Sequence, residues 1–435
     1  MSAARWAAFE ILRRVEDGVF SSGLLATEEP KLEPSDRALC HELVLGVLRW
    51  QLYLDKIIEH YSNRKTTSLD KSVLIALRLG LYQLRFLTRI PPSAAVDESV
   101  KIVHAAKLSS ARAFVNAILR RATREKDYDP SDDISDPIQK LSIRNSHPEW
   151  LVERWVDSFG FAETDAFTKA NNETPVAAFR VVRGKASEAE VLRKLRDAGT
   201  EPQPSKLVQS AWRVSSVSKV VRELADTGYI YLQDEASQLV AQSVAARDGE
   251  LILDLCAAPG GKTTLIGDRA DTYVVANDVS ERRLGTVAKT LGIHELENVA
   301  LVVSDGSKNL PYFPNTFNRV LVDAPCTGTG TLRRNPEIRW RLSVEDIKRL
   351  SAQQQRLLIN ASHVLKPGGR MVYSTCSVEE EENEQVVAEF LKTNSEFRQI
   401  RLSAGSGLLT ESGALRTWPQ HNGTDGFFVA AFEKA

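Results

Sequence analysis

From about residue 229 onward, short apolar segments alternate with segments of helical periodicity, and this alternation constrains the fold more than any other feature. The apolar segments cover residues 251–255, 273–277, 299–303, 320–323 and 371–374. Strands that alternate with helices in this way form an open, mostly parallel sheet with helices on both faces. Because ligands of such sheets bind beyond the carboxyl ends of the strands, the chemistry of this chain is expected at those ends.

The front of the chain has a different pattern. Over residues 3–126, apolar residues recur at spacings of three and four, and breakers such as Pro30 and Asn63 divide the segment into several helices. This pattern predicts an all-α helical bundle over 1–128. The acidic residues 129–145 are expected to form a linker. Residues 146–228 mix both patterns, which predicts a small α+β middle subdomain ahead of an α/β domain over 229–435.

The charge is unevenly distributed along the chain. Residues 1–126 hold 20 Lys and Arg against 14 Asp and Glu, whereas the whole chain has a net charge of −1. A basic module joined to an acidic one is typical of a polyanion-binding domain attached to an enzyme, and compositional scatter is the alternative. No apolar run is long enough to span a bilayer, and the first residues have no apolar signal core, so we expect a cytoplasmic protein.

The chain has only four cysteines, and their spacing argues against a metal site or a disulfide framework. They form no C-x-x-C pair and have no zinc-like spacing with the seven histidines. We expect Cys40, which lies in a helical pattern, to be a core residue. The other three, Cys256, Cys326 and Cys376, follow predicted strands. Their positions at the strand ends decide whether each is a packing residue or a reactive thiol.

The first strand of the α/β domain runs into a turn of small residues that opens a helix near Thr263. We expect this turn to bind a cofactor through Cys256, Ala257, Ala258, Pro259, Gly260, Gly261 and Lys262. Small residues let the backbone approach a ligand closely, and a helix N-terminus offers free N–H groups. The turn lacks the spacing of a phosphate loop and contains no GxGxxG. Cys256 is expected to be a packing residue without chemistry of its own.

Two carboxylates after the next strands point to an adenosine ligand without phosphates. Asp278 follows the second strand, where a carboxylate is suited to accept hydrogen bonds from both ribose hydroxyls and would repel a phosphate. Asp305 follows the third strand, where it can accept from an adenine amino group. The set fits S-adenosylmethionine, whose sulfonium charge also favours an acidic rim. Alternatively, Asp278 and Asp305 are exposed loop carboxylates.

The fourth and fifth strands each end close to a cysteine. Asp323 and Cys326 close the fourth strand, and Cys376 closes the fifth. If these strands are neighbours, all three side chains meet on one rim above the cofactor. A thiolate that adds to carbon 6 of cytosine makes carbon 5 nucleophilic enough to accept a methyl group, and a second cysteine can then remove the carbon 5 proton. A carboxyl such as Asp323 can hydrogen-bond the amino group and ring nitrogen 3. The alternative for either cysteine alone is a buried core residue.

The chain resembles the RNA cytosine-5 methyltransferases of the Sun/Fmu (RsmB) family. The runs that carry the resemblance are LDLCAAPGGKT, DAPCTGTG, RRNPEIRWR and GGRMVYSTCSVEEEENE, and it extends over the whole chain, with a helical front similar to the antitermination factor NusB and a tail RTWPQHNGTDGFFVAAF. It implies a C-terminal Rossmann-like class I S-adenosylmethionine-dependent methyltransferase domain. Thr327 stands where the family commonly has Ser, which keeps the hydroxyl.

The resemblance also implies roles for individual residues. Cys376 is expected to be the nucleophile and Cys326 the base that releases it. The residues 256–262 with Asp278, Asp305 and Asp323 are expected to lie at the cofactor and the target base. The implied substrate is small-subunit (16S) ribosomal RNA or an assembly intermediate of that subunit.

Other interpretations stay open at this point. The same chemistry can act on a tRNA or another RNA, and a non-catalytic RNA-binding assembly or antitermination factor is an alternative of another class; the intact cysteines count against the latter. By analogy with the family, the front domain helps to hold RNA. Candidate contacts are Arg49, Arg78, Arg85, Arg89, Arg120 and Arg121. We expect a monomer with no membrane or metal partner.

Overall fold

The computed structural model describes residues 1–269, 271–403, 405 and 407–435. The chain divides into two compact units, which are described separately. The first, the helical unit, consists of Met1–Thr174 and Leu332–Arg341, and the second, the sheet unit, consists of Pro175–Thr331 and Leu342–Ala435. A segment of ten residues from within the expected α/β domain therefore belongs to the helical unit. Its ends join the two units covalently.

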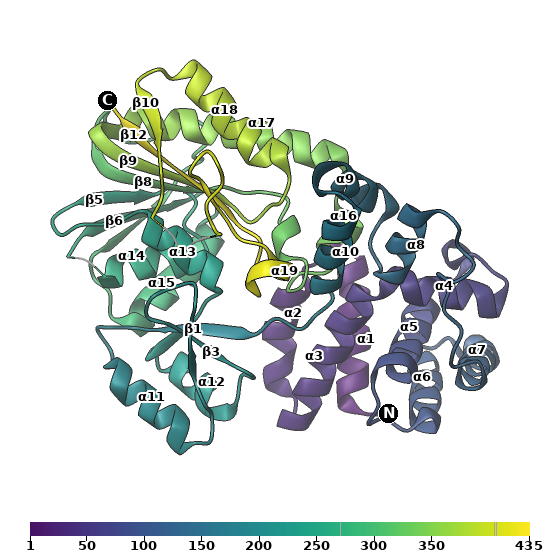
Figure 1. The fold of residues 1–435 in the computed structure, drawn as a ribbon. Helices are drawn as coiled ribbons and strands as arrows, with labels where there is room; N and C mark the ends of the chain where they lie inside the picture. Colours follow the sequence, from purple (N-terminus) through teal and green to yellow (C-terminus); the bar gives the residue numbers. More distant parts are fainter. Residues whose placement is uncertain (270, 404, 406) are drawn as a thin grey trace. The chain divides into compact units, whose positions relative to one another are not determined.

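Helices with one apolar face build the helical unit. They are α1 (Ala3–Glu16), α2 (Ser21–Glu28), α3 (Pro34–Arg49), α4 (Gln51–Ser62), α5 (Lys71–Phe86), α6 (Pro92–Ala105), α7 (Arg112–Arg124), α8 (Pro137–Arg144), α9 (Glu149–Phe159), α10 (Phe161–Ala170) and the short α16 (Ile338–Arg341) (Figure 1). Ile75, Leu77 and Leu79 of α5 are buried in the core that α1 to α7 share. The all-helical bundle expected at the front of the chain is confirmed.

The residues between the bundle and the first strand are more ordered than their composition indicates. The stretch 129–145, expected to be a linker, contains α8, whose Leu141 and Ile143 are buried. Helices α9 and α10, expected in the middle subdomain, group with the helical unit. Trp155 of α9 is buried and its ring meets Phe167 of α10 edge to face, with 4.9 Å between the ring centroids.

The segment Leu332–Arg341 is held in the helical unit by hydrogen bonds to main-chain oxygens. Arg339 is fully buried, and its guanidinium donates to the oxygen of Ser146 at 3.0 Å and to Asn172 Oδ1 at 2.9 Å. The indole N–H of Trp340 donates to the oxygen of Leu48 at 2.7 Å. Burial lowers the pKa of Arg339 to about 9, so the side chain is still a cation at neutral pH. A buried charge of this kind is tolerated because both terminal nitrogens of the guanidinium find acceptors, although its Nε has none among the described residues.

Several arginines expected to contact RNA are part of the interior instead. Arg78 is buried and pairs with Asp55 at 2.7 Å and Glu16 at 2.8 Å, and Arg49 is also buried, where it donates to the oxygen of Arg333. Arg85 donates to the main-chain oxygens of Glu125 and Lys126. The prediction that Arg49 and Arg78 bind RNA is therefore wrong, because both are buried and internal acceptors occupy them, whereas the prediction for half-buried Arg85 stays a prediction. Sequence spacing alone does not distinguish such arginines from surface ones.

A small antiparallel sheet opens the sheet unit. Its strands β1 (Ala177–Val181), β2 (Gln203–Pro204), β3 (Ala211–Val214) and β4 (Ile230–Leu232) have the order β2-β3-β1-β4, and the helices are α11 (Glu188–Asp197) and α12 (Lys219–Asp226). Val191, Leu195 and Leu224 of these helices pack in the same apolar cluster as Phe179 of β1. Because β4 pairs with β1, the boundary expected at residue 229 falls before the last strand of this sheet.

The large sheet carries the pattern of alternating strands and helices. Its strands are β5 (Leu251–Asp254), β6 (Tyr273–Asp278), β7 (Val299–Val303), β8 (Phe317–Asp323), β9 (Leu365–Thr375), β10 (Phe397–Ile400), β11 (Leu415–Arg416) and β12 (Phe428–Lys434). The order is β10-β12-β9-β8-β5-β6-β7, with β11 beside β12. The five strands β5 to β9 pair in parallel as expected, and the antiparallel strands β10 to β12 extend the sheet beyond β9.

Helices cover both faces of this sheet. Helices α13 (Glu235–Ser243), α14 (Gly261–Arg269) and α15 (Glu281–His294) lie on one face, and α17 (Val344–Val364) and α18 (Glu384–Thr393) lie on the other (Figure 1). Side chains along β8 alternate between the two cores, since Val320 and Val322 join one cluster and Leu321 joins the other. None of the helices that the structure describes is both long and apolar enough to cross a membrane.

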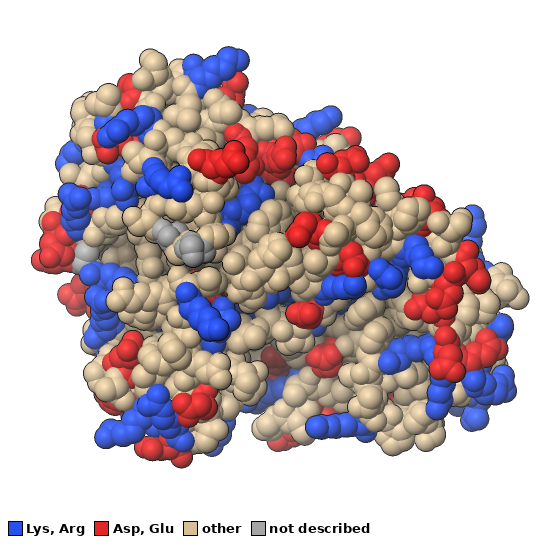
Figure 2. Space-filling model, in the orientation of Figure 1, with Lys and Arg blue, Asp and Glu red and all other residues tan. Residues whose placement is uncertain are grey.

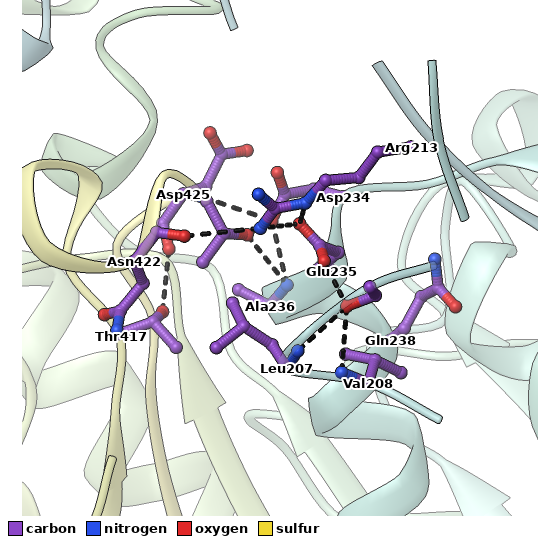
Figure 3. A network of polar contacts seen from close by, with 12 residues as sticks. Leu207, Val208, Arg213, Asp234, Glu235, Ala236, Gln238, Thr417, Asn422 and Asp425 are labelled. Carbon is purple, nitrogen blue, oxygen red and sulfur yellow. Dashed lines mark hydrogen bonds and ion pairs between the residues drawn. The ribbon is translucent and has the colours of Figure 1, made fainter. Parts of the chain in front are cut away.

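A polar network fixes the loop before β12 to the start of α13 (Figure 3). Asp234 accepts from the N–H groups of Ala236 at 2.9 Å and Asp425 at 3.2 Å. Arg213 of β3 pairs with Glu235 and donates to the oxygen of Asn422 at 3.3 Å. The loop that follows α19 (Pro419–Asn422) is therefore fixed to the small sheet as well as to α13.

We predict that Arg78→Ala destabilises the protein by about 3–5 kcal/mol, because it leaves the Asp55 carboxylate, whose side chain is only 14% exposed, without its partner. Urea unfolding of the full-length chain measures the change. Arg89→Ala, at an exposed position near the end of the same helix, is the control and should change stability by less than about 0.5 kcal/mol. Equal effects of the two substitutions would contradict the structural role of Arg78.

Candidate active site

Two neighbouring strands bring the paired cysteines together. Strands β8 and β9 are parallel, with Asp323 opposite Ser374, so the loops that follow them start side by side. The Sγ atoms of Cys326 and Cys376 are 3.3 Å apart, and the main-chain N–H of Cys376 donates to Cys326 Sγ at the same distance. Both side chains are partly exposed. Two thiols in contact on an accessible rim can act one after the other on the same part of a substrate.

Asp323 lies on the same rim and forms an ion pair with Lys262 of the small-residue turn after β5. Its Oδ2 accepts from Lys262 Nζ at 2.7 Å, and its Oδ1 accepts from the hydroxyl of Ser374 at 2.7 Å. Burial would lower the pKa of Lys262, but the Asp323 carboxylate and the nearby Cys376 raise it above its ordinary value. Lys262 is thus a permanent cation at the point where Asp323 and the cysteines meet.

The loop before β12 forms a further wall of this site. The Lys262 ammonium lies over the ring of Phe427, 5.2 Å from its centroid. The N–H of Gly426 donates to the oxygen of Gly330 at 2.8 Å, and the N–H of Gly330 donates to the oxygen of Cys376 at 2.9 Å. A Cβ atom at Gly330 would lie 2.0 Å from the oxygen of Gly426, so only glycine allows this approach.

A cavity of 190 Å³ opens beside the turn that follows β5. Small-sheet residues and the turn line it together: Tyr231, Leu232, Gln233, Ser237, Asp254, Cys256, Ala257, Ala258, Pro259, Gly261, Lys262 and Asp323. The peptide bond between Ala258 and Pro259 is cis, and Gly260 has a φ of +104°, which favours glycine. A Cβ atom at Gly261 would lie 2.9 Å from the Tyr231 ring, so the turn and β4 are close-packed.

One carboxylate oxygen in this cavity lacks a partner. Asp254 ends β5 and is buried; its Oδ2 accepts from the Thr263 hydroxyl at 2.7 Å, whereas its Oδ1 has no hydrogen bond among the described residues. Burial raises the pKa of Asp254 to about 7. An unpaired buried acceptor beside a cavity fits a ligand that brings a donor, as the α-ammonium of S-adenosylmethionine would.

The two carboxylates expected to bind adenosine lie at the ends of β6 and β7. Asp278 is buried and already accepts from the N–H groups of Ala258 at 3.3 Å and Ser280 at 2.9 Å. Asp305 is partly exposed; hydrogen bonds from Ser307 lower its pKa despite the small opposing effect of burial. Both side chains offer acceptor oxygens on the same edge of the sheet as the cavity, which fits a ligand with ribose and adenine donors. Their roles stay predictions.

Raised pKa values keep Cys40 and Cys256 as inert thiols, and Cys326 is set apart from them only by its contact with Cys376. Burial, followed by three nearby glutamate and aspartate charges, raises the pKa of Cys40 to about 12. Burial and the charges of Asp254, Asp323 and Asp278 raise the pKa of Cys256 well above its ordinary value. Cys326 also has a strongly raised pKa, first because of its hydrogen bond with Cys376 and then because of burial and the Glu382 charge. Cys256 therefore packs in the turn, as expected.

The sequence analysis did not predict several residues of this site, four of them polar and one, Phe427, aromatic. Glu382 and Asn383 are fully buried beside the two cysteine loops, and Tyr231 and Gln233 of the β4 region line the cavity. Phe427 was noted only as part of the tail. The acidic run 379–382 gives no sign that its last member is buried while Glu380 is exposed.

The fold and the site define a Rossmann-like methyltransferase. Family models for 16S rRNA methyltransferase RsmB/F, the NusB family and the ferredoxin-like domain of RsmF/B-like methyltransferases match residues 241–433, 2–124 and 147–221, respectively. The chain is 31% identical to a probable ribosomal RNA small subunit methyltransferase B from Bacillus subtilis, over 100% of this chain and 99% of the relative. It is 36% identical to the ribosomal RNA small subunit methyltransferase B of Erwinia tasmaniensis, over 98% and 97% of the two chains.

Solved structures agree with this assignment. The crystal structure of PH0851 superposes with a TM-score of 0.86 at 27% identity, covering 99% of this chain and 98% of that one. A methyltransferase homolog from Pyrococcus horikoshii covers 69% of this chain and 100% of its own, with a TM-score of 0.60 at 29% identity. The chain therefore belongs to the ribosomal RNA small subunit methyltransferase B family, and S-adenosylmethionine is its methyl donor. The expected NusB-like front and Rossmann-like domain are confirmed.

We predict that a thiol-alkylating reagent at pH 8 modifies Cys376 first and leaves Cys40 unmodified in the folded protein. With a pKa of about 12, only about one Cys40 thiol in ten thousand is ionised at that pH. Peptide mass spectrometry after brief treatment with iodoacetamide measures the order of reaction. Modification of Cys40 at the same rate as Cys376 would contradict the burial described here.

Proposed function

We propose that the protein methylates carbon 5 of a specific cytosine in small-subunit (16S) ribosomal RNA through a covalent bond between Cys376 and carbon 6. The observation that carries the proposal is the 3.3 Å contact between Cys326 Sγ and Cys376 Sγ, beside the Asp323 carboxylate. Methylation of an amino or hydroxyl group requires no thiol, whereas carbon 5 of cytosine is too weak a nucleophile without one. Two thiols on one rim match an attack step and a release step.

In the attack step, the Cys376 sulfur forms a bond to carbon 6, and the electron pair of the ring double bond shifts toward carbon 5. Bound S-adenosylmethionine would supply the methyl group: that electron pair on carbon 5 would form the new carbon–carbon bond while the bond from the methyl group to the sulfonium sulfur breaks, leaving S-adenosylhomocysteine. Asp323 accepts a hydrogen bond from the cytosine amino group, while Lys262 keeps this carboxyl oriented through the 2.7 Å ion pair. The same carboxylate would face the lone pairs of oxygen 4 in a uracil, so Asp323 favours cytosine.

In the release step, the proton on carbon 5 passes to the Cys326 sulfur. The electron pair of the broken C–H bond restores the ring double bond, and the bond between Cys376 and carbon 6 breaks to return the Cys376 thiolate. Cys326 must lose its own proton first. In the free enzyme the hydrogen bond with Cys376, then burial and the Glu382 charge, raise the Cys326 pKa; once Cys376 is bonded to carbon 6, burial and Glu382 remain, and they keep the Cys326 thiolate scarce but basic.

The names of the relatives and the NusB-like helical unit support an RNA substrate. The target base must leave its stack to reach the rim that carries the two cysteines. Acidic side chains gather along α17 and α18 (Figure 2), and an acidic surface disfavours phosphates, although the exposed Glu384 and Glu389 pair with Arg416 and Lys392. Of the arginines expected to hold RNA, Arg89 and Arg120 are exposed and have no acidic partner in the described part of the chain. We propose that they contribute RNA contacts and that the enzyme acts in the cytoplasm as a monomer.

We predict that Cys376→Ala reduces methyl transfer by at least about 10³-fold while binding S-adenosylmethionine normally, because the nucleophile is lost but the cavity is not. The assay uses full-length protein, labelled cofactor and unmodified 16S ribosomal RNA, with bulk tRNA as the alternative substrate. Nucleoside analysis of the product should reveal 5-methylcytosine in the ribosomal RNA. Full turnover in the variant, or label in tRNA alone, would overturn the corresponding part of the proposal.

We predict that Cys326→Ala accumulates a protein–RNA adduct that survives denaturant, because the carbon 5 proton cannot be removed. A denaturing gel with labelled RNA detects the adduct, and Cys376→Ala is the matched control that should form none. In the wild type, release should speed up about tenfold per pH unit below the Cys326 pKa, since the ionised fraction rises at that rate. A Cys326→Ala variant that turns over at the wild-type rate would rule out the release role.

A further inference from the structure

Glu382 is a buried carboxyl that the mechanism above does not use. It ends the short helix η5 (Glu380–Glu382) and has no exposed surface, although Glu380 in the same run of glutamates is exposed. Burial raises its pKa, and hydrogen bonds from Ser377, Thr327 and Gln354 partly offset this effect. Burying a carboxyl is costly unless donors surround it, so its partners indicate what it does.

Most partners of the Glu382 carboxyl hold the loop that carries Cys326, and Ser377 of the Cys376 loop is the exception. The N–H of Thr327 donates to Oε1 at 3.0 Å and to Oε2 at 3.3 Å, and the Thr327 hydroxyl donates to Oε2. Gln354 of α17 donates to Oε1 at 2.9 Å and, with the same amide nitrogen, to the oxygen of Pro325 at 3.0 Å. The carboxyl thus fixes the residues on both sides of Cys326.

Asn383, the next residue, fixes the loop that carries Cys376. The Asn383 side-chain amide donates to the oxygen of Ser377 at 2.9 Å, and its Oδ1 accepts from the Thr375 hydroxyl. Thr375 and Ser377 are the residues immediately before and after Cys376. Asn383 has no exposed surface either. Two consecutive buried residues therefore each bracket one cysteine.

We propose that Glu382 and Asn383 are positioning residues that set the separation of the two thiols, Glu382 by fixing the Cys326 loop and Asn383 by fixing the Cys376 loop. This inference rests on the proposed function of the two cysteines. Because Glu382 and Asn383 are joined by one peptide bond, the two cysteine loops are fixed to the same short segment of main chain. A displacement of about 1 Å in such a site can reduce a rate about a hundredfold.

The partners explain why the first position needs a carboxylate. Four donor groups, the Thr327 N–H and hydroxyl, the Gln354 amide and the Ser377 hydroxyl, converge on the two oxygens of Glu382, and three of them hold the Cys326 loop. A glutamine would replace one acceptor by an NH₂ group and direct a donor at a donor in a buried place. Glu382→Gln therefore conserves shape but releases the Cys326 loop. Asn383→Ala releases the Cys376 loop in the same way.

The two variants should affect different steps. With unmodified 16S ribosomal RNA and full-length protein, Glu382→Gln should form the covalent adduct at near the wild-type rate but release it about 10–100-fold more slowly, so that the adduct accumulates. Asn383→Ala should instead slow adduct formation by a similar factor and accumulate little adduct. The affinity for S-adenosylmethionine should stay within about threefold in both, because neither residue lines the cavity.

Glu380→Gln is the matched control, the same substitution at an exposed position two residues away, and should behave as the wild type. Thr327→Ala removes only one donor to Glu382 and should give a weaker form of the Glu382→Gln effect if that variant does not fold. Wild-type release by Glu382→Gln and Thr327→Ala, or equal loss of both steps in Glu382→Gln and Asn383→Ala, would overturn the positioning role. If the wild type yields no 5-methylcytosine or Cys326→Ala yields no adduct, the proposed function fails instead.

Discussion

The parallel register of β8 and β9 is the constraint on which the rest of the site depends. Asp323 lies opposite Ser374 in this register, and each strand leads into a cysteine within three residues. The two strands are packed between apolar cores on both faces. A slip by one residue would send every side chain to the opposite face, at the cost of both cores. The contact between Cys326 and Cys376 therefore takes its precision from the most buried part of the sheet.

The carboxyls around this register have three different electrostatic environments. Asp323 is neutralised by Lys262 and stays on the rim. Asp254 keeps one oxygen without a partner beside the cavity, and burial brings its pKa to about 7. Glu382 is enclosed by donors and is out of contact with solvent. Electrostatic interactions are strong in a medium of low dielectric constant, so each environment favours one role for its carboxyl. Within one domain, one carboxyl can therefore pair with a cation, another can offer an acceptor to a ligand, and a third can hold a loop.

Local patterns in the sequence predicted the parallel strands, the small-residue turn and the candidate cysteines, because short apolar segments and strand-end motifs depend only on nearby residues. The interior arginines were not predictable in this way. Whether Arg78 faces RNA or the core depends on Asp55 and Glu16, which come from other helices. Glu382 was hidden for a related reason: its donors, Thr327 and Gln354, are distant in sequence. Long-range polar partners, rather than periodicity, decided these positions.

The same limitation explains the segment Leu332–Arg341. Its motif predicts membership of the α/β domain, yet its acceptors lie in the helical unit, at Leu48, Ser146 and Asn172. The segment begins two residues after Gly330, whose N–H donates to the oxygen of Cys376. The acceptors of Arg339 and Trp340 are divided between residues before and after the linker region, so removal of residues 1–126 would leave Trp340 without its partner. The segment Leu332–Arg341 is therefore fixed by acceptors within the helical unit itself, from both ends of the sequence that forms this unit.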